Sequence, residues 1–399
     1  MPLQIYDVRE RRLVRAADAV LSAAAAVRAP FRRRRSPSRS LRRILLLRLE
    51  RIGDLLMTLP AIADVRSLSP DAEIDLVVGH WNAAIAEAVP DVTRVEALDA
   101  RWLARDAGGA GLPALLGRAR RWRSQHYDLA INFEPDIRSN LLIAASGAAR
   151  TAGYRSGGGG PILDLALEFD PHAHTTDNAR RLVGEVFGHR PADASRPLLR
   201  VPEHAVRTAA SRLASAGQRP IVAVHTSGGR AIKQWEPERF AAVAETLARV
   251  HSATIVLTGT DGDRHVTDVV KAAVPADRMI DVVGDADLLA LAALLARVNL
   301  LVTGDTGPMH LAAAVGTPVV AVFGPSDPVR YAPRGAADRV VRVDLPCSPC
   351  NRIRLPPARC VGHTPDCLVS VSVERVLEAA VSVLSASPAG RARTGTGSP

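Results

Sequence analysis

The stretch NLLVTGDTGPMHLAAAVGTPVVAVFGPSDP, residues 299–328, decides the fold. Its pattern predicts a buried strand over residues 299–302, a small polar turn, a helix over 309–315 and a second strand over 319–323. Strands that alternate with helices form a parallel sheet, and the loops after the strands lie together at one edge of it. We therefore expect an α/β fold with a ligand site at that edge.

The same alternation occurs in two sets along the chain. The first set has predicted helices over 55–68 and near 139–145, and predicted strands over 44–49, 74–78 and 129–133. The second set, which ends with residues 299–328, begins with strands over 221–224 and 255–257 and helices over 240–250 and 287–297. Each set predicts one doubly wound domain. The glycine run at 157–161 is interpreted as a flexible loop.

Composition limits the function classes. The chain has 399 residues, 47% of them hydrophobic, which is enough for two packed domains. The formal charge of +10 favours anionic partners such as nucleotides, phosphorylated sugars or an acidic membrane face. No apolar run reaches the roughly 18–20 residues that cross a bilayer, and Arg15 and Asp18 interrupt the stretch that would make residues 1–30 a signal peptide. All four cysteines lie between residues 347 and 367, which suits a reducing compartment.

The N-terminal segment has two interpretations. Residues 7–28 carry apolar side chains at helical spacing, and Arg32 to Arg35 follow them. One interpretation is an amphipathic helix that docks on an anionic membrane surface. The alternative is an arginine-rich leader that packs on the first domain.

The loop at 304–310 carries features that suit a diphosphate. Gly304 and Gly307 allow the backbone to approach a ligand closely, and the following helix offers free N–H groups and its positive end. His310 lies in the first turn of that helix. Asp305 suits helix N-capping, or accepting hydrogen bonds from hydroxyls, better than phosphate contact.

The loop after the strand at 221–224 contains Thr226, Ser227 and Lys233. Hydroxyls and a lysine can bind a phosphate and neutralise the charge of a leaving group. The chain has only two lysines, Lys233 and Lys271, so chance placement in such a loop is less expected than usual. The alternative is a surface loop with a solvated lysine.

Asp54 follows Gly53 at the turn between the first strand and first helix of the first domain. A carboxylate there could take a proton from an acceptor hydroxyl, provided that both sheets open onto a common cleft. The more common role for an aspartate at such a turn is a helix N-cap.

Two further sets of residues have metal-ligand spacing. The pairs Asp261/Asp263 and Asp285/Asp287 are weak signals for a divalent metal, and Asp287 is better explained as a helix cap. A tetrahedral structural zinc site is indicated by the four residues Cys347, Cys350, Cys360 and Cys367. An iron–sulfur cluster uses the same ligands, and free or disulfide-paired thiols also fit this spacing.

Taken together, these segments resemble glycosyltransferase family 9, the ADP-heptose:lipopolysaccharide heptosyltransferases. The matching stretches follow the family's order: ILLLRLERIGDLLMTLPAI (44–62), VHTSGGRAIKQWEPERF (224–240), VLTGTDGDR (256–264) and VTGDTGPMHLAAAVGTPVVAVFGPSDP (302–328). The resemblance implies the GT-B fold, in which two Rossmann-like domains face a central cleft. It also implies an inverting glycosyltransferase that requires no cofactor for catalysis.

The resemblance assigns roles residue by residue. It implies that Asp54 is the general base and that Lys233 stabilises the departing diphosphate. The implied donor-binding residues are Thr226, Ser227, Lys233, Asp261, Asp305, Thr306, Gly307 and His310; the family more often has Glu where this chain has Asp261. Candidates for binding an anionic acceptor, with ordinary surface charge as the alternative, are Arg48, Arg51 and Arg138.

Five segments follow from these assignments: a basic amphipathic extension (1–40), an acceptor-binding Rossmann-like domain (41–200), a nucleotide-sugar-binding Rossmann-like domain (218–345), a Cys-rich segment with a C-terminal helix (346–385) and a disordered tail (386–399). The expected partners are a nucleotide-sugar donor, with ADP-heptose favoured, and an anionic glycan or glycolipid acceptor, but no nucleic acid. The expected location is the cytoplasm, with peripheral contact at the inner membrane.

Two other functions fit the same sequence features. One is a non-catalytic sugar-nucleotide-binding protein that kept the fold. The other is a GT-B enzyme of another kind, such as a sugar-nucleotide epimerase.

Overall fold

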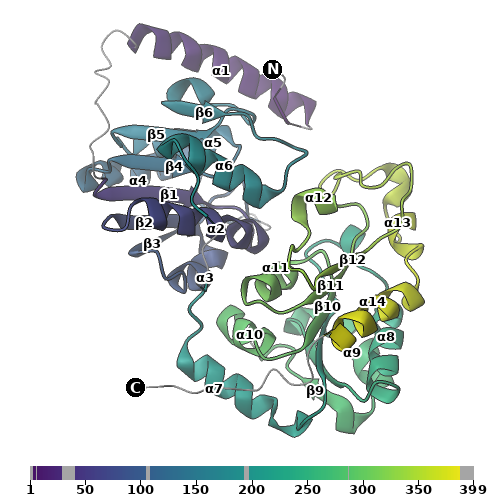
Figure 1. The fold of residues 1–399 in the computed structure, drawn as a ribbon. Helices are drawn as coiled ribbons and strands as arrows, with labels where there is room; N and C mark the ends of the chain where they lie inside the picture. The colour runs from purple at the N-terminus through teal and green to yellow at the C-terminus, as the bar shows by residue number, and fades with distance from the viewer. Residues whose placement is uncertain are drawn as a thin grey trace, which may run out of the picture. The chain divides into compact units, whose positions relative to one another are not determined.

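The computed structural model describes residues 3–5, 7–28, 41–104, 108–192, 197–285 and 287–386. The chain forms two compact units, Met1–Arg200 and Val201–Pro399. Each unit is built on one six-stranded parallel sheet with helices packed against it (Figure 1).

The sheet of the first unit has the strand order β3-β2-β1-β4-β5-β6, and every pairing is parallel. Its strands are β1 (Arg43–Arg48), β2 (Glu73–Gly79), β3 (Arg94–Leu98), β4 (Leu129–Asn132), β5 (Arg150–Tyr154) and β6 (Leu165–Leu167). The helices of this unit are α1 (Val8–Arg28), α2 (Ile52–Leu68), α3 (Ala83–Glu87), α4 (Leu112–Arg121), α5 (Ile137–Ala145) and α6 (Thr175–Phe187).

The sheet of the second unit has the order β12-β11-β10-β7-β8-β9, again with parallel pairings. Its strands are β7 (Ile221–His225), β8 (Thr254–Thr258), β9 (Met279–Asp281), β10 (Leu300–Gly304), β11 (Val319–Val322) and β12 (Arg339–Val341). The helices are α7 (Glu203–Arg212), α8 (Pro237–Arg249), α9 (Arg264–Ala273), α10 (Leu288–Leu295), α11 (Gly307–Ala314), α12 (Pro328–Tyr331), α13 (Asp366–Val369) and α14 (Val373–Ala386).

Both sheets have the doubly wound order 3-2-1-4-5-6 when their strands are counted within each unit. The chain therefore reverses direction across the sheet between β1 and β4 in the first unit, and between β7 and β10 in the second. Ligands of doubly wound folds bind outside the carboxyl ends of the strands at this reversal point. The topology thus selects the loops after these four strands as candidate sites.

The central strands were predicted well because helices cover both faces of each sheet. The side chains of Ile44, Leu45, Leu46 and Leu47 in β1 are fully buried. Such strands are continuous apolar runs rather than alternating ones. Helix starts were predicted less accurately: α8 begins at Pro237 rather than residue 240, because a proline is favoured in the first helical turn.

The glycine run predicted as a flexible loop is instead a packed turn, so that interpretation was wrong. Residues 157–160 are buried, and Gly158 and Gly159 have φ angles of 92° and 77°. The amide of Gly159 donates to Asp18 Oδ1 at 2.6 Å, and Asn140 Nδ2 donates to the Gly158 carbonyl at 2.7 Å. The glycines are needed for their backbone conformation and not for mobility.

The turn also receives helix α1, which packs on the first unit through Val14 and Asp18. Packing on the first domain, one of the two interpretations of this segment, is therefore found. Leu13 and Val20 are 72% and 68% exposed, and contact of this face with a membrane stays a prediction. No helix in the described part of the chain is long and apolar enough to span a bilayer. The basic cluster Arg32–Arg35 and the predicted tail from residue 387 onward lie outside the described residues.

Helices α2 and α6 are joined by a buried ion pair, which generates a stability prediction. Arg180 donates to both carboxylate oxygens of Asp64, at 2.6 and 2.9 Å, and the two side chains are 7% and 2% exposed. Asp64→Ala leaves the guanidinium buried without this carboxylate, so the free energy of unfolding in urea should fall by about 3–5 kcal/mol. The matched control is Glu245→Ala, which breaks an exposed pair with Arg249 and should cost about 1 kcal/mol or less. Equal losses in the two variants would contradict the prediction.

Candidate functional site

The loops after β7 and β10 meet at the reversal point of the second sheet. Thr303 at the end of β10 lies opposite His225 at the end of β7. Lys233 Nζ forms an ion pair with Asp305 Oδ2 at 2.7 Å. A Cβ atom placed on Gly228 would lie 3.5 Å from Thr306 Cγ2, so the two loops also lie close together at this point. The predicted residues of both loops thus share one edge of the sheet.

Asp305 organises this contact rather than capping the helix. The N-cap residue of α11 is Thr306, whose hydroxyl lies 3.2 Å from that of Thr303, so the N-cap interpretation of Asp305 was wrong. Burial alone would raise the pKa of Asp305. The Lys233 ammonium, a hydrogen bond from Ser326 and the nearby His310 outweigh burial and hold this pKa below its ordinary value. Asp305 is therefore a buried carboxylate that fixes the position of Lys233.

Thr226 is a buried residue of this loop whose hydroxyl has no partner among the described residues. Its side chain is 3% exposed, and its Oγ1 forms no hydrogen bond within the described residues. A buried hydroxyl left unpaired costs about 1–3 kcal/mol, so such groups are rare unless they await a ligand. Thr226 is therefore the strongest local indication that something polar binds here.

Ser227 is connected to a buried histidine that sequence reasoning passed over. Ser227 Oγ lies 3.1 Å from His225 Nε2, and His225 Nδ1 lies 3.0 Å from Thr258 Oγ1. Burial lowers the pKa of His225 to about 4, so its ring is neutral at physiological pH. His225 thus positions the Ser227 hydroxyl and does not contribute charge. Its place at the end of a predicted strand was the only signal for this role.

The aspartates after β8 and before α10 form no metal site within the described residues. Asp261 is exposed at the start of a short 3-10 turn, and its carboxylate lies against Gly284. Asp263 accepts hydrogen bonds from the backbone and hydroxyl of Thr260, both at 2.7 Å. Asp287 caps α10 by accepting from two backbone amides, which confirms its predicted capping role.

In the first unit, Asp54 lies in the first turn of α2, directly after β1. Its Oδ2 accepts from the backbone amide of Arg51, the N-cap residue, and its Oδ1 accepts from Arg48 Nη2, both at 3.2 Å. The carboxylate is still 28% exposed, so it remains accessible to a ligand. Asp54 therefore completes a capping box and is held by an arginine, while keeping a free surface.

Arg48 is buried and lies at the centre of an acidic network in which Glu134 is buried and Glu50 and Asp54 are partly exposed. Its Nη2 also contacts Glu50 at 3.1 Å, and its Nη1 donates to the Phe133 carbonyl. Glu134, after β4, accepts from the backbone amides of Leu49 and Glu50. Burial raises the pKa of Glu50 to about 8 despite the opposing Arg48, with repulsion from Asp54 adding to the rise; burial likewise raises the pKa of Glu134. Sequence reasoning missed both glutamates.

The predicted acceptor arginines already have partners inside the chain. Arg48 contacts Glu50 and Asp54, and Arg138 pairs with Asp136 at 2.6 Å and with Glu10 at 3.2 Å. The guanidinium of Arg51 stacks on Trp81, with 4.6 Å between its central carbon and the ring centroid, and donates to the Leu103 carbonyl. Their binding of an acceptor stays a prediction that these contacts do not favour.

The cysteines contribute no metal centre to the described structure. All four are free thiols, and no group of three or more His, Cys, Asp or Glu residues within the described ranges is arranged to hold a metal ion. Burial raises the pKa of the Cys367 thiol, with Cys350 and Cys347 close enough to add to the rise. A structural zinc ion at these cysteines stays a prediction.

Comparisons with known proteins identify the kind of chain that carries these loops. The model of glycosyltransferase family 9 (heptosyltransferase) matches residues 117–357. The lipopolysaccharide core heptosyltransferase OpsX of Haemophilus influenzae is 23% identical over 302 residues, which cover 75% of this chain and 83% of that protein.

Solved structures give the fold. A family 9 glycosyltransferase from Veillonella parvula has a TM-score of 0.73 at 24% identity, covering 88% of this chain and 99% of that one. The ADP-heptose lipopolysaccharide heptosyltransferase II of Escherichia coli has a TM-score of 0.68 at 21% identity, covering 86% and 98%. At these identities the likeness shows the fold alone, and it confirms the predicted GT-B class.

The raised pKa of Glu50 generates a pH prediction for the chain without ligand. The folded chain keeps a proton on Glu50 up to about pH 8, whereas an unfolded glutamate releases it near its ordinary pKa of about 4.3. Between these values the folded state binds more protons, so stability falls as pH rises. Glu50→Gln removes this proton uptake. The melting temperature of the variant should therefore fall less than that of the wild type between about pH 5 and pH 8.5. Each kcal/mol of free energy of unfolding corresponds to roughly 2–4 °C in melting temperature.

The measurement is a series of thermal melts across that range, with the exposed Glu245→Gln as the control. The control should follow the wild-type curve. A Glu50→Gln curve that runs parallel to the wild type would contradict the raised pKa.

Proposed function

Because the chain belongs to glycosyltransferase family 9, the heptosyltransferases, we propose that it transfers heptose from ADP-heptose to an anionic glycan or glycolipid acceptor, such as a lipopolysaccharide core. The proposal of this donor and acceptor is supported by the names of its relatives. The observation that carries it in this chain is the buried, unpartnered hydroxyl of Thr226, at the loop edge where α11 begins.

The donor diphosphate binds, in this proposal, against the loops after β7 and β10. Thr226 Oγ1 donates to a phosphate oxygen and so gains the partner that it lacks in the free chain. Gly307 begins α11, and the first turn of a helix presents backbone N–H groups, here with the exception of Pro308, and the positive end of the helix dipole. The backbone and a hydroxyl thus supply directional contacts without any metal ion.

Lys233 supplies the positive charge for the departing diphosphate. An ammonium has three donors, and in the free chain it contacts the Asp305 carboxylate at 2.7 Å. Its side chain is 21% exposed, so further donors can reach a phosphate. Asp305 holds the ammonium in place beforehand, which lowers the cost of ordering it during the reaction.

Asp54 acts as the general base in the proposed inverting step. Its carboxylate takes the proton of the acceptor hydroxyl, and the hydroxyl oxygen forms a bond to the anomeric carbon of the heptose. The bond from that carbon to the diphosphate oxygen breaks, and ADP leaves with the electron pair. Arg48 and the Arg51 amide fix the carboxylate while leaving it 28% exposed. A single displacement of this kind inverts the anomeric configuration.

Loss of the base should abolish transfer while sparing donor binding. Asp54→Asn keeps the shape of the side chain but cannot accept the proton, so kcat for ADP release from ADP-heptose with a lipopolysaccharide-core acceptor should fall about 10²–10⁴-fold. The dissociation constant for ADP should stay within about twofold of the wild type. The control is Asp99→Asn, an exposed aspartate that contacts His80. Transfer by Asp54→Asn within about threefold of the wild type would refute the assignment.

Thr226→Val tests the donor site by a contrast between stability and binding. Valine has the same shape but no buried hydroxyl to desolvate, so the melting temperature without nucleotide should be unchanged or higher. Loss of a hydrogen bond to charged phosphate should weaken ADP binding about tenfold or more, measured by calorimetry.

The matched control is Thr317→Val, another buried threonine of the second unit. Its hydroxyl donates to the Leu295 carbonyl, so this change should lower the free energy of unfolding by about 1 kcal/mol and leave ADP binding intact. A Thr226 variant that loses stability and keeps its ADP affinity would count against the donor site.

A further inference from the structure

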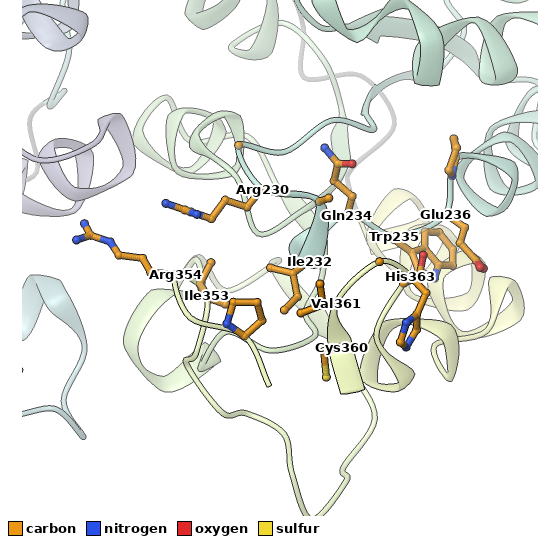
Figure 2. Close-up of a pocket in the computed structure, with 16 residues that line it drawn as sticks. Arg230, Ile232, Gln234, Trp235, Glu236, Ile353, Arg354, Cys360, Val361 and His363 are labelled. Carbon is orange, nitrogen blue, oxygen red and sulfur yellow. The ribbon is translucent and has the colours of Figure 1, made fainter. Parts of the chain in front are cut away.

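A pocket of about 750 Å³ lies beside the proposed donor loop, in a part of the second unit to which no role has been assigned. One wall is formed by residues 229–232 and 234–237, and the other by residues 353, 354, 356 and 360–364 of the Cys-rich segment (Figure 2). A volume of this size fits a ligand of one to a few sugar rings, since small-molecule pockets span about 300–1,000 Å³.

The pocket and the Lys233–Asp305 pair share one loop. Ile232 and Gln234, the neighbours of Lys233 on either side, both line the pocket. Gln234 also ties the loop together, because its Nε2 donates to the Gly228 carbonyl at 2.8 Å. A ligand in the pocket would therefore lie next to the loop that carries the proposed donor contacts.

The charge of the pocket favours an anion. Arg230 and Arg354 extend to the same side of it (Figure 2), and neither guanidinium group has a hydrogen bond or ion pair to any described residue. The one carboxylate of the lining, Glu236, lies toward the other side and is paired with Arg239 at 2.5 Å. The lining thus includes two arginines whose guanidinium groups have no partner among the described residues, and its acidic group is already neutralised. Such pairs suit phosphate or carboxylate oxygens.

The floor between the charged sides is apolar. Ile232, Ile353 and Val361 lie between Arg230 and the Glu236 side of the pocket (Figure 2), and Val361 is 60% exposed. Exposed apolar groups of this kind cover the C–H faces of a sugar ring, while charged groups hold its substituents. The lining therefore matches a sugar that carries an acidic group better than it matches a free inorganic ion.

We propose that this pocket binds an acidic sugar of the acceptor, through its phosphate or carboxylate group, with Arg230 and Arg354 as the anion-binding residues. The proposal rests on the glycosyltransferase function proposed above and deepens it. It assigns the anionic part of the acceptor to residues that sequence reasoning did not select, in place of arginines that already contact carboxylates of the chain.

The test uses the full chain with its donor site filled by saturating ADP. Glucose 6-phosphate, glucuronate, glucose and inorganic phosphate are titrated separately by calorimetry. The double variant R230A/R354A removes the two pocket arginines. The matched control R352A/R359A removes the same charge from exposed arginines of the same segment that do not line the pocket.

Glucose 6-phosphate and glucuronate should bind to the wild type and to R352A/R359A, whereas glucose should not. Their affinity for R230A/R354A should be at least about tenfold lower. Equal binding to all three chains, equal loss in both double variants, or no binding of either acidic sugar to the wild type would overturn the proposal. Inorganic phosphate that binds as tightly as glucose 6-phosphate would also overturn it, because the apolar floor would then contribute nothing.

Two further readouts separate this proposal from the proposed function. With ADP-heptose and a lipopolysaccharide-core acceptor, R230A/R354A should raise the KM for the acceptor and leave the KM for ADP-heptose unchanged. An unchanged KM for the acceptor in an active enzyme would overturn the pocket assignment alone. Absence of any transfer by the wild type, together with acidic-sugar binding that depends on Arg230 and Arg354, would overturn the proposed reaction and leave the binding site standing.

Discussion

The ion pair between Lys233 and Asp305 determines how the second unit presents its ligand-binding loops. Where two parallel strands end side by side, the loops that follow them are no longer joined by the hydrogen bonds of the sheet. A 2.7 Å contact between a half-buried ammonium and a buried carboxylate supplies that connection. It fixes the 304–310 turn against the 226–234 loop, and this loop also forms one wall of the arginine-lined pocket. The proposed donor contacts and the pocket therefore depend on the same link.

In the first unit, Arg48 connects the loops that follow the two adjacent central strands. Strands β1 and β4 also end side by side, and the residues after them are joined by Arg48, Glu50 and Glu134. The buried charge in this network is Arg48, which would be costly to leave unpaired, and it contacts Glu50, Asp54 and the Phe133 carbonyl. The side chains of Asp54 and Glu50 keep 28% and 30% of their surface exposed. In each unit a basic residue thus holds carboxyl groups in place at the reversal point, and a few polar groups remain accessible to a ligand.

The sequence predicted the features that depend on local patterns. Apolar runs such as residues 44–49 indicated the central strands, and Asp287 before an apolar run indicated its helix cap. The contacts of Asp305 and Glu50 could not be predicted, because they join residues far apart in the chain or depend on burial that only the fold creates. The same limit explains the glycine run at 157–160, whose partners come from α1 and α5. The roles of Arg230 and Arg354 were hidden because they lie 124 positions apart.

Net charge is a poor guide to where this chain binds its anionic ligands. A formal charge of +10 makes attraction of nucleotides and acidic glycans general, but it does not distinguish one arginine from another. Arg48, Arg138 and Arg180 form ion pairs with carboxylates of the chain itself. An arginine so paired has little to offer an external phosphate, since the ligand would have to displace a carboxylate that is already in place. Recognition therefore falls to groups whose partners are missing, such as the Thr226 hydroxyl and the two pocket guanidiniums. The ligand is therefore selected by polar groups that have no partner within the chain, whereas the positive net charge of the whole protein only attracts anionic ligands toward it.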